Sequence, residues 1–248
     1  MPIVSITIPC NNGTFLEQTL QSVYDQTFKD MEIILVDDGS TDGIIEKIQP
    51  NFAKAPIPIK LVKNEKNMGI GYTRQRAIEE ASGKYIALLA ADDCFLPQKT
   101  VKQLKLLQEG DAVCYSNYID IDDKNNQLRI FSAPYHQDRD QLALEIWAWA
   151  KRNDCFVNFS SLMAPKKYFE QLPFDKELKR SEDLDWILKA CKLFPFKFTE
   201  EPLIKYRRHA QMESNIRGAG DIITTAQFII SRAEKWWKDG SDNQQPKL

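Results

Sequence analysis

Apolar and polar positions change period along the chain, and this change separates predicted strands from predicted helices. Over the first 110 residues, short apolar runs alternate with stretches whose apolar side chains recur every three or four residues. We expect strands at Ile3–Pro9, Glu32–Val36, Ile59–Val62 and Tyr85–Leu89, and helices at Thr14–Tyr24, Ile44–Ile48, Tyr72–Ala81 and Gln98–Gln108. This alternation is typical of an α/β protein with a parallel, doubly wound sheet.

The second half of the chain is less regular. We expect strands at Ala112–Ile121, Gln127–Phe131, Cys155–Met163 and Phe196–Tyr206, and helices near Arg139–Ala150, at Ser181–Leu193 and at Asp221–Lys238. No internal repeat or low-complexity segment divides the chain. We therefore expect one domain over residues 1–220, with a nucleotide-binding half (1–110) and a smaller mixed half (111–220). A C-terminal amphipathic helix and tail (221–248) follow it.

Composition and charge exclude several classes of protein. The formal net charge is −2, which gives no electrostatic support to nucleic-acid binding. No apolar run approaches the ~20 residues that cross a bilayer, and the N-terminal stretch lacks the basic start and cleavage site of a signal peptide. The five cysteines are widely spaced and form no CxxC pair. We therefore expect reduced thiols in a cytoplasmic protein, with neither disulfides nor a zinc site.

Two pairs of adjacent acids follow predicted parallel strands. Asp37 and Asp38 end one strand, and Asp92 and Asp93 end another. The carboxyl ends of such strands border the crevice where open α/β sheets bind ligands, and carboxylates there suit a nucleotide with Mg²⁺ or Mn²⁺. The competing interpretation is an ordinary strand-end turn that faces water. The side chains that would complete a nucleotide pocket come from the next glycine-bearing loop and helix: Asn67, Gly69 and Arg74.

Four motifs make the first 110 residues recognisable: VSITIP, EIILVDDGSTD, NMGIGYTRQRAI and GKYIALLAADD, in that order. In this order and spacing they resemble the family 2 glycosyltransferases of the GT-A fold. The resemblance implies a Rossmann-like, mostly parallel sheet flanked by helices, with a smaller mixed region on the acceptor side. It places Asp92 on the metal-binding last acid of the family's DxD motif, whose first acid is replaced here by Ala90. It assigns Pro9 and Asn12 to the nucleotide pocket with Asp93, Asp38 to the base, and Arg74 to the base or the diphosphate.

Glu182 and Asp183 begin a predicted helix. Acids in a first turn complement the helix dipole, and this structural role alone would explain them. By the resemblance, the second acid lies beside the acceptor hydroxyl, so Asp183 is the expected general base. An ionised carboxylate can take this role within hydrogen-bond reach of the proton. Glu182, its neighbour, is the competing candidate.

The segment Tyr206–His209 follows the last predicted strand. A lone histidine is most often structural or solvated, but neutral imidazole is a competent metal ligand and arginine suits diphosphate. Many bacterial members of the family carry a similar YRxH segment. The resemblance therefore makes His209 a metal ligand beside Asp92 and assigns Arg207 to the diphosphate.

Together these features predict an inverting, metal-dependent transfer of a sugar from a nucleotide-diphosphate donor, expected to be a UDP-sugar. The expected acceptor is a hydroxyl of a glycan or lipid-linked molecule in bacterial surface polysaccharide synthesis. Three alternatives remain open. One is a sugar-phosphate nucleotidyltransferase, although PCNNGTF lacks that class's glycine-rich loop and lysine. The others are a phospho-receiver or regulatory nucleotide-binding module, and a transferase inactivated by the loss of the acid at Ala90.

The predicted C-terminal helix has one apolar face. Such a stripe usually packs on the domain or on a neighbouring subunit, which would allow a homodimer. The basic residues and two tryptophans instead favour weak, peripheral contact with the inner face of an anionic membrane. The apolar face is Ile222, Ala226, Ile229, Ala233 and Trp237, and the interface residues are Arg232, Lys235, Trp236 and Lys238.

Overall fold

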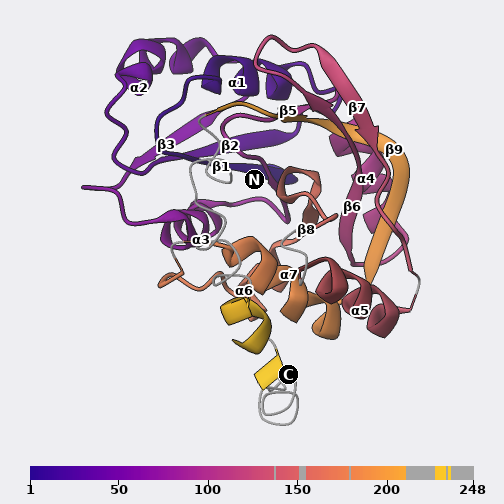
Figure 1. Cartoon of the computed structure of the whole chain (residues 1–248). Coiled ribbons are helices and arrows are strands. Elements are labelled where there is room, and N and C mark those ends of the chain that lie inside the picture. Colours follow the sequence, from indigo (N-terminus) through magenta and orange to yellow (C-terminus); the bar gives the residue numbers. More distant parts are fainter. Residues whose placement is uncertain (137, 151–154, 179, 211–226, 233, 236–248) are drawn as a thin grey trace.

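The computed structural model describes residues 1–136, 138–150, 155–178, 180–210, 227–232 and 234–235. Within these residues one mixed sheet has the strand order β3-β2-β1-β4-β8-β6-β9-β5, and β7 pairs with β6 (Figure 1). The strands are β1 Val4–Cys10, β2 Met31–Asp37, β3 Ile59–Lys63, β4 Tyr85–Leu88, β5 Cys94–Phe95, β6 Val113–Ile121, β7 Gln127–Phe131, β8 Met163–Pro165 and β9 Phe196–Arg207. The helices are α1 Leu16–Tyr24, α2 Ile44–Ile48, α3 Ile70–Glu80, α4 Lys99–Gln108, α5 Arg139–Ala150, α6 Lys166–Gln171 and α7 Glu182–Leu193, with 3-10 helices η1 Gln49–Lys54 and η2 Phe159–Ser161.

The first half is the predicted parallel layer. β1 pairs in parallel with β2 and β4, and β2 pairs in parallel with β3. Because successive side chains of a strand point to opposite faces, β2 supplies two cores. Ile33 and Leu35 pack with α1, α2 and α4, whereas Ile34 and Val36 pack with α3, α5 and α7. Figure 1 shows α1 and α2 above the sheet and α3, α5 and α7 below it. The expected doubly wound half is confirmed.

The second half contains one wrong prediction. Cys155–Met163 is not a strand: it contains η2, and only the three residues of β8 enter the sheet, antiparallel between β4 and β6. The Asn158 side chain accepts a hydrogen bond from Ser160 N at 2.8 Å, and Ser161 Oγ donates to Asn158 O at 2.7 Å. These local side-chain bonds stabilise a turn in place of a strand ladder.

The two-residue strand β5 was not predicted, but it sets the geometry of the site. It pairs antiparallel with β9, Cys94 with Lys205 and Phe95 with Ile204. The residues before β5 therefore lie beside the residues after β9. This pairing brings the acid pair Asp92 and Asp93 next to the segment that begins at Arg207.

The predicted C-terminal helix is described in part. Residues 227–232 are helical, and Ile229 is fully buried in the core that also contains α5 and α7. Arg232 is ion-paired with Asp175. Ile222, Ala226, Ala233, Trp236, Trp237 and Lys238 lie outside the described residues. The described turn thus packs on the domain.

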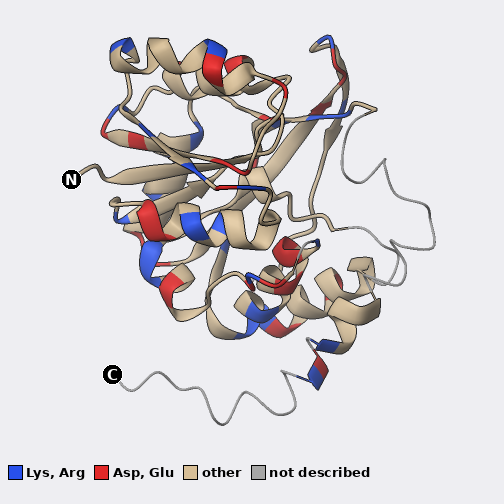
Figure 2. Ribbon diagram, turned by 90° about the vertical axis from the view of Figure 1, so that its left-hand side faces the viewer, with Lys and Arg blue, Asp and Glu red and all other residues tan. Residues whose placement is uncertain are grey.

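The surface carries mixed charge. Figure 2 shows lysine and arginine interspersed with aspartate and glutamate on the helices, in keeping with the net charge of −2. In the part of the chain that the structure describes, we find no helix of the length and apolarity needed to cross a bilayer.

Candidate active site

Asp92 and His209 form the pair at the centre of the candidate site. Asp92 lies in the turn after β4 and His209 follows β9, and His209 Nε2 lies 3.0 Å from Asp92 Oδ2. The Phe15 ring packs against the imidazole, with 5.0 Å between ring centroids. Asp92 keeps 32% of its side chain exposed, so its carboxylate remains accessible. The structure therefore brings together the two residues that the sequence assigned to a metal.

This donor set fits a divalent cation bound together with a diphosphate. Among the described residues, no group of three or more His, Cys, Asp or Glu side chains forms a complete metal cage. Mg²⁺ is typically held by one or two carboxylates and completed by water and substrate phosphates, and a neutral imidazole nitrogen is a common metal ligand in proteins. Asp92 and His209 supply such a partial set, and the donor's phosphates would complete it.

Asp93 points into the protein. It is 1% exposed, and its two oxygens accept hydrogen bonds from Ser160 Oγ at 2.5 Å and from Arg207 N at 3.0 Å. Burial, followed by the neighbouring Asp92 charge, raises the pKa of Asp93 well above its usual range. Asp93 was expected at the cofactor, but both of its carboxylate oxygens are bonded to groups of the protein itself. Asp93 instead ties η2 and the end of β9 to the turn that carries Asp92.

Arg207 is also an internal support. Its side chain is fully buried, and its Nε donates to Asp92 O at 2.9 Å. Its other donors reach the turn after β6 and helix α1, where Asn125 Oδ1 accepts at 2.8 Å and Gln18 Oε1 at 2.9 Å. The guanidinium also lies 4.4 Å from the Phe15 ring centroid. The expected diphosphate contact therefore finds no exposed group, and Arg207 holds the Asp92 turn in place.

Asp38 fixes the glycine-bearing loop. It is 4% exposed, and its carboxylate accepts hydrogen bonds from Asn64 Nδ2 at 2.6 Å, Met68 N at 2.8 Å and Gly69 N at 3.1 Å. Asn67 Oδ1 also accepts from Gly69 N, at 3.0 Å. Gly69 has a φ of 93°, which side chains other than glycine rarely adopt. Asp38 therefore stabilises the conformation of the predicted base-binding loop by accepting hydrogen bonds from its backbone.

Two other predicted pocket residues lie near the carboxyl end of β1, Pro9 within the strand and Asn12 just after it. Pro9 is buried in β1 opposite Val36 of β2. Asn12, which has a φ of 62°, accepts a hydrogen bond from Thr41 N at 3.0 Å through Oδ1. Its backbone N–H donates to Ser40 Oγ at 3.1 Å. The two strand-end loops are therefore joined at the edge of the sheet where Asp38 lies.

Glu182 and Asp183 have different surroundings in the first turn of α7. Glu182 is buried and ion-paired with Arg74, whereas Asp183 keeps 38% of its side chain exposed. Asp183 Oδ1 accepts a hydrogen bond from Leu184 N at 2.8 Å. Only the exposed carboxylate is open to an acceptor, which favours Asp183 over Glu182 as the expected base.

Arg74 joins the two halves of the molecule. Its Nη1 also lies 3.8 Å from Asp183 Oδ2, and its guanidinium carbon is 3.3 Å from the centroid of the Phe159 ring. Arg74 was expected in the donor pocket, and the structure places it against the acid pair. Phe159 and Ser160 were not identified from the sequence, because the pattern around them predicted a strand.

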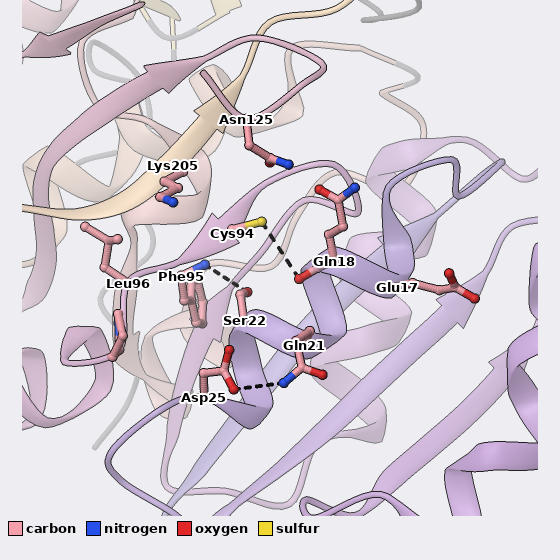
Figure 3. Close-up of a pocket in the computed structure, with 11 residues that line it drawn as sticks. Glu17, Gln18, Gln21, Ser22, Asp25, Cys94, Phe95, Leu96, Asn125 and Lys205 are labelled. Atoms are coloured by element: carbon pink, nitrogen blue, oxygen red, sulfur yellow. Dashed lines mark hydrogen bonds between the residues drawn. The ribbon is translucent and has the colours of Figure 1, made fainter. Parts of the chain in front are cut away.

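A pocket of about 450 Å³ lies between α1 and β5 (Figure 3). Its lining is mainly apolar, and two of the amide side chains that line it, Gln18 and Asn125, also bind the Arg207 guanidinium. It contains neither Asp92 nor Asp183. The lining residues are Glu17, Gln18, Gln21, Ser22, Asp25, Cys94, Phe95, Leu96, Pro97, Asn125 and Lys205.

Comparison with known proteins defines the class. Residues 5–164 match the family model described as "Glycosyl transferase family 2". The chain is 32% identical over 211 residues to an uncharacterized glycosyltransferase of Methanocaldococcus jannaschii, covering 83% of this chain and 71% of that protein. A second uncharacterized glycosyltransferase, from Rickettsia conorii, is 30% identical over 218 residues, and the match covers 86% of this chain and 35% of that longer protein. The chain belongs to glycosyl transferase family 2 and is a glycosyltransferase.

Solved structures agree on the fold. The S. aureus TarS fragment 1–349 in complex with UDP-GlcNAc has a TM-score of 0.73 at 17% identity, covering 95% of this chain and 67% of that chain. The mannosyltransferase PcManGT from Pyrobaculum calidifontis in complex with GDP-Man and Mn²⁺ has a TM-score of 0.61 at 14% identity, covering 97% and 76%. The predicted GT-A fold is confirmed. Family membership also removes the nucleotidyltransferase and phospho-receiver interpretations.

Proposed function

We propose that the chain transfers a sugar from a UDP-sugar to a hydroxyl group, with inversion at the anomeric carbon. The observation that carries this proposal is the Asp92–His209 pair at 3.0 Å on the carboxyl edge of the parallel strands. It is the partial set of ligands that a metal-bound diphosphate requires. A relative by fold, TarS, was solved with UDP-GlcNAc, which supports UDP as the nucleotide.

The donor side is built from strand-end loops. Asp92 and His209 would hold Mg²⁺ or Mn²⁺ with the diphosphate, and the Asp38-anchored loop at Asn67 and Gly69 would border the base. A cation bound there would offset the negative charge that builds on the leaving diphosphate. Arg207 and Asp93 keep the Asp92 turn in position for this contact. PcManGT, which has the same fold, contains Mn²⁺ in its complex with GDP-Man.

The acceptor side depends on Asp183. Its exposed carboxylate takes the proton from the acceptor hydroxyl while that oxygen attacks the anomeric carbon from the face opposite the diphosphate. The leaving group is already activated, so one carboxylate is sufficient, unlike in hydrolases that pair two. Attack from the opposite face inverts the anomeric configuration.

We assign the reaction to surface polysaccharide synthesis, with a glycan or lipid-linked acceptor. One relative carries the description "Putative teichuronic acid biosynthesis glycosyltransferase TuaG" in Bacillus subtilis. It is 38% identical over 109 residues, which are 44% of this chain and 43% of that protein.

The test measures acceptor-independent hydrolysis of a panel of UDP- and GDP-sugars. We expect hydrolysis of at least one UDP-sugar with Mn²⁺ or Mg²⁺ and none in chelator, because the cation activates the leaving group. Asp92→Asn should lower this rate at least about 100-fold. No hydrolysis or metal-dependent binding of any donor would overturn the proposal and would favour a transferase inactivated at Ala90.

The matched control is Asp30→Asn. Asp30 is exposed and lies just before β2, at the opposite end of the parallel strands from Asp92. We expect the wild-type rate from this variant. Equal rates for Asp92→Asn and Asp30→Asn would remove Asp92 from the site.

A further inference from the structure

One buried carboxylate on β6 is shared by two arginines. Asp120 is 2% exposed, and its Oδ2 lies 2.5 Å from Arg129 Nε on β7. Its Oδ1 lies 3.1 Å from Arg208 Nε, in the segment that follows β9. The three residues form a cluster that we name the arginine pair, Arg129 and Arg208 on Asp120.

The arginine pair carries excess positive charge. One carboxylate balances only one of two guanidinium groups, which stay ionised at any physiological pH. Arg129 and Arg208 keep 58% and 40% of their side chains exposed. Within the described residues, the Arg129 side chain makes a hydrogen bond only through Nε, so its Nη1 and Nη2 groups remain available to a ligand.

Aromatic rings hold both guanidinium groups in place. The Arg129 guanidinium lies 5.5 Å from the Phe131 ring centroid, and that of Arg208 lies 4.5 Å from the Tyr206 centroid. Tyr118 joins these two rings, stacked on Phe131 at 4.6 Å and edge-on to Tyr206 at 5.7 Å. Stacked arginines lose little conformational freedom when they bind, which favours tight, bidentate contact with an anion.

The arginine pair borders the candidate active site. Arg208 immediately precedes His209, which contacts Asp92. Tyr206 and Asp120 are partners across β9 and β6, so the pair lies on the half of the sheet that the donor loops do not use. The turn after β6 also carries acids, and the Asp122 carboxylate there accepts hydrogen bonds from Lys124 N at 2.9 Å and Asn126 N at 2.8 Å.

We infer that Arg129 and Arg208 bind an anionic group, a carboxylate or phosphate, of the acceptor glycan. This inference rests on the proposed function and names the acceptor class: a polyanionic glycan whose charged unit lies one or more residues from the attacking hydroxyl. A neutral acceptor would leave the excess charge beside the site without a partner. The donor diphosphate is the second source of the same anion chemistry.

The experiment measures binding of fluorescently labelled oligosaccharides to the full chain. The probes are an oligogalacturonide, an oligomer of glycerol phosphate and a neutral galacto-oligosaccharide of matched length. We expect wild-type protein to prefer a charged probe, and Arg129→Gln with Arg208→Gln to weaken that binding at least about tenfold. Lys124→Gln, which removes an exposed charge from the same hairpin, should change it less than about twofold. No preference for either charged probe, or equal losses in all these variants, would overturn the inference.

Two further measurements keep the outcomes separate. Asp120→Asn removes the competing carboxylate, so we expect tighter binding of the charged probe, and weaker binding in a folded variant would contradict the inference. UDP affinity should be unchanged in Arg129→Gln, and a parallel loss would assign the pair to the donor diphosphate. Donor hydrolysis tests the proposed function alone. If the chain binds the charged probe through both arginines but hydrolyses no donor, the anion site is supported and the proposed transfer reaction is contradicted.

Discussion

Arg74 Nη1 lies 3.8 Å from Asp183 Oδ2 and is also ion-paired with Glu182. Arg74 comes from α3 of the donor-side half, and both acids begin α7 of the other half. A single guanidinium, stacked on Phe159, therefore fixes the expected base relative to the donor loops. Orientation of this kind can supply several kcal/mol of a barrier, and about 1 Å of misplacement can cost 100-fold in rate.

We predict that Arg74→Gln lowers kcat for transfer about 100-fold and leaves KM for the donor nearly unchanged, because Asp183 loses its anchor. Arg74→Lys should recover part of kcat, since it keeps the charge but not the planar fork. Steady-state kinetics with varied donor separate the two constants. A large rise in donor KM at constant kcat would instead return Arg74 to the diphosphate. Lys60→Gln, which breaks an exposed pair with Glu80, is the control and should match the wild type.

Asp183→Asn should abolish transfer while UDP binding stays within about twofold of the wild type, because the acid lies outside the donor loops and serves as base. The adjacent Glu182→Gln should mainly destabilise the fold, since it leaves the Arg74 guanidinium without its buried partner. Transfer assays and thermal unfolding measure the two effects. An active Asp183→Asn beside a folded, inactive Glu182→Gln would mean that Glu182 is the base.

The parallel half of the fold was predictable because its strands and helices are marked by patterns within short stretches of sequence. In β2, alternate apolar residues serve two cores, and the acids follow directly at the strand end. The site could not be predicted in the same way, because it depends on contacts between residues far apart in the sequence. Gln18, for example, binds the Arg207 guanidinium although the two residues are 189 positions apart. No local pattern distinguishes a buried, fully bonded arginine such as Arg207 from an exposed one. The Cys155–Met163 prediction failed because hydroxyl and amide side chains bond to the backbone there.

Asp38→Ala should weaken UDP binding about tenfold. The variant removes the acceptor for Met68 N and Gly69 N, so the loop that borders the base loses its anchor. Titration calorimetry with UDP and metal measures the affinity. Glu65→Gln provides the control, because Glu65 is exposed just before the same loop. Unchanged affinity in a folded Asp38→Ala would show that neither Asp38 nor the loop it holds contributes to nucleotide binding.

Lys99 supports a prediction on pH and stability. Its side chain is fully buried in α4. Its Nζ donates a hydrogen bond to Gln103 Oε1 at 2.7 Å and lies 4.2 Å from the Phe95 ring centroid. Burial lowers the pKa of Lys99 to about 7. The unfolded chain keeps an ordinary pKa near 10.4, so between about pH 7 and pH 10 it binds a proton that the folded chain has released. The Lys99 contribution to the free energy of unfolding therefore rises with pH across that window, by at most about 1.4 kcal/mol per pH unit. Below pH 7 both states are protonated, and the full cost of burying the charge remains.

Lys99→Met should accordingly raise the free energy of unfolding at pH 7 by about 2 kcal/mol, since it replaces a buried ammonium with an apolar chain of similar length. The advantage over the wild type should shrink as the pH rises toward 10, because releasing the Lys99 proton on folding costs less as the pH approaches the pKa of the unfolded chain. Denaturant unfolding of both proteins at several pH values measures the difference. Lys102→Met on the same helix removes a partly exposed ion pair with Glu201 and should show no such trend. An advantage that stays constant from pH 7 to pH 10 would mean that Lys99 keeps its proton in the folded chain.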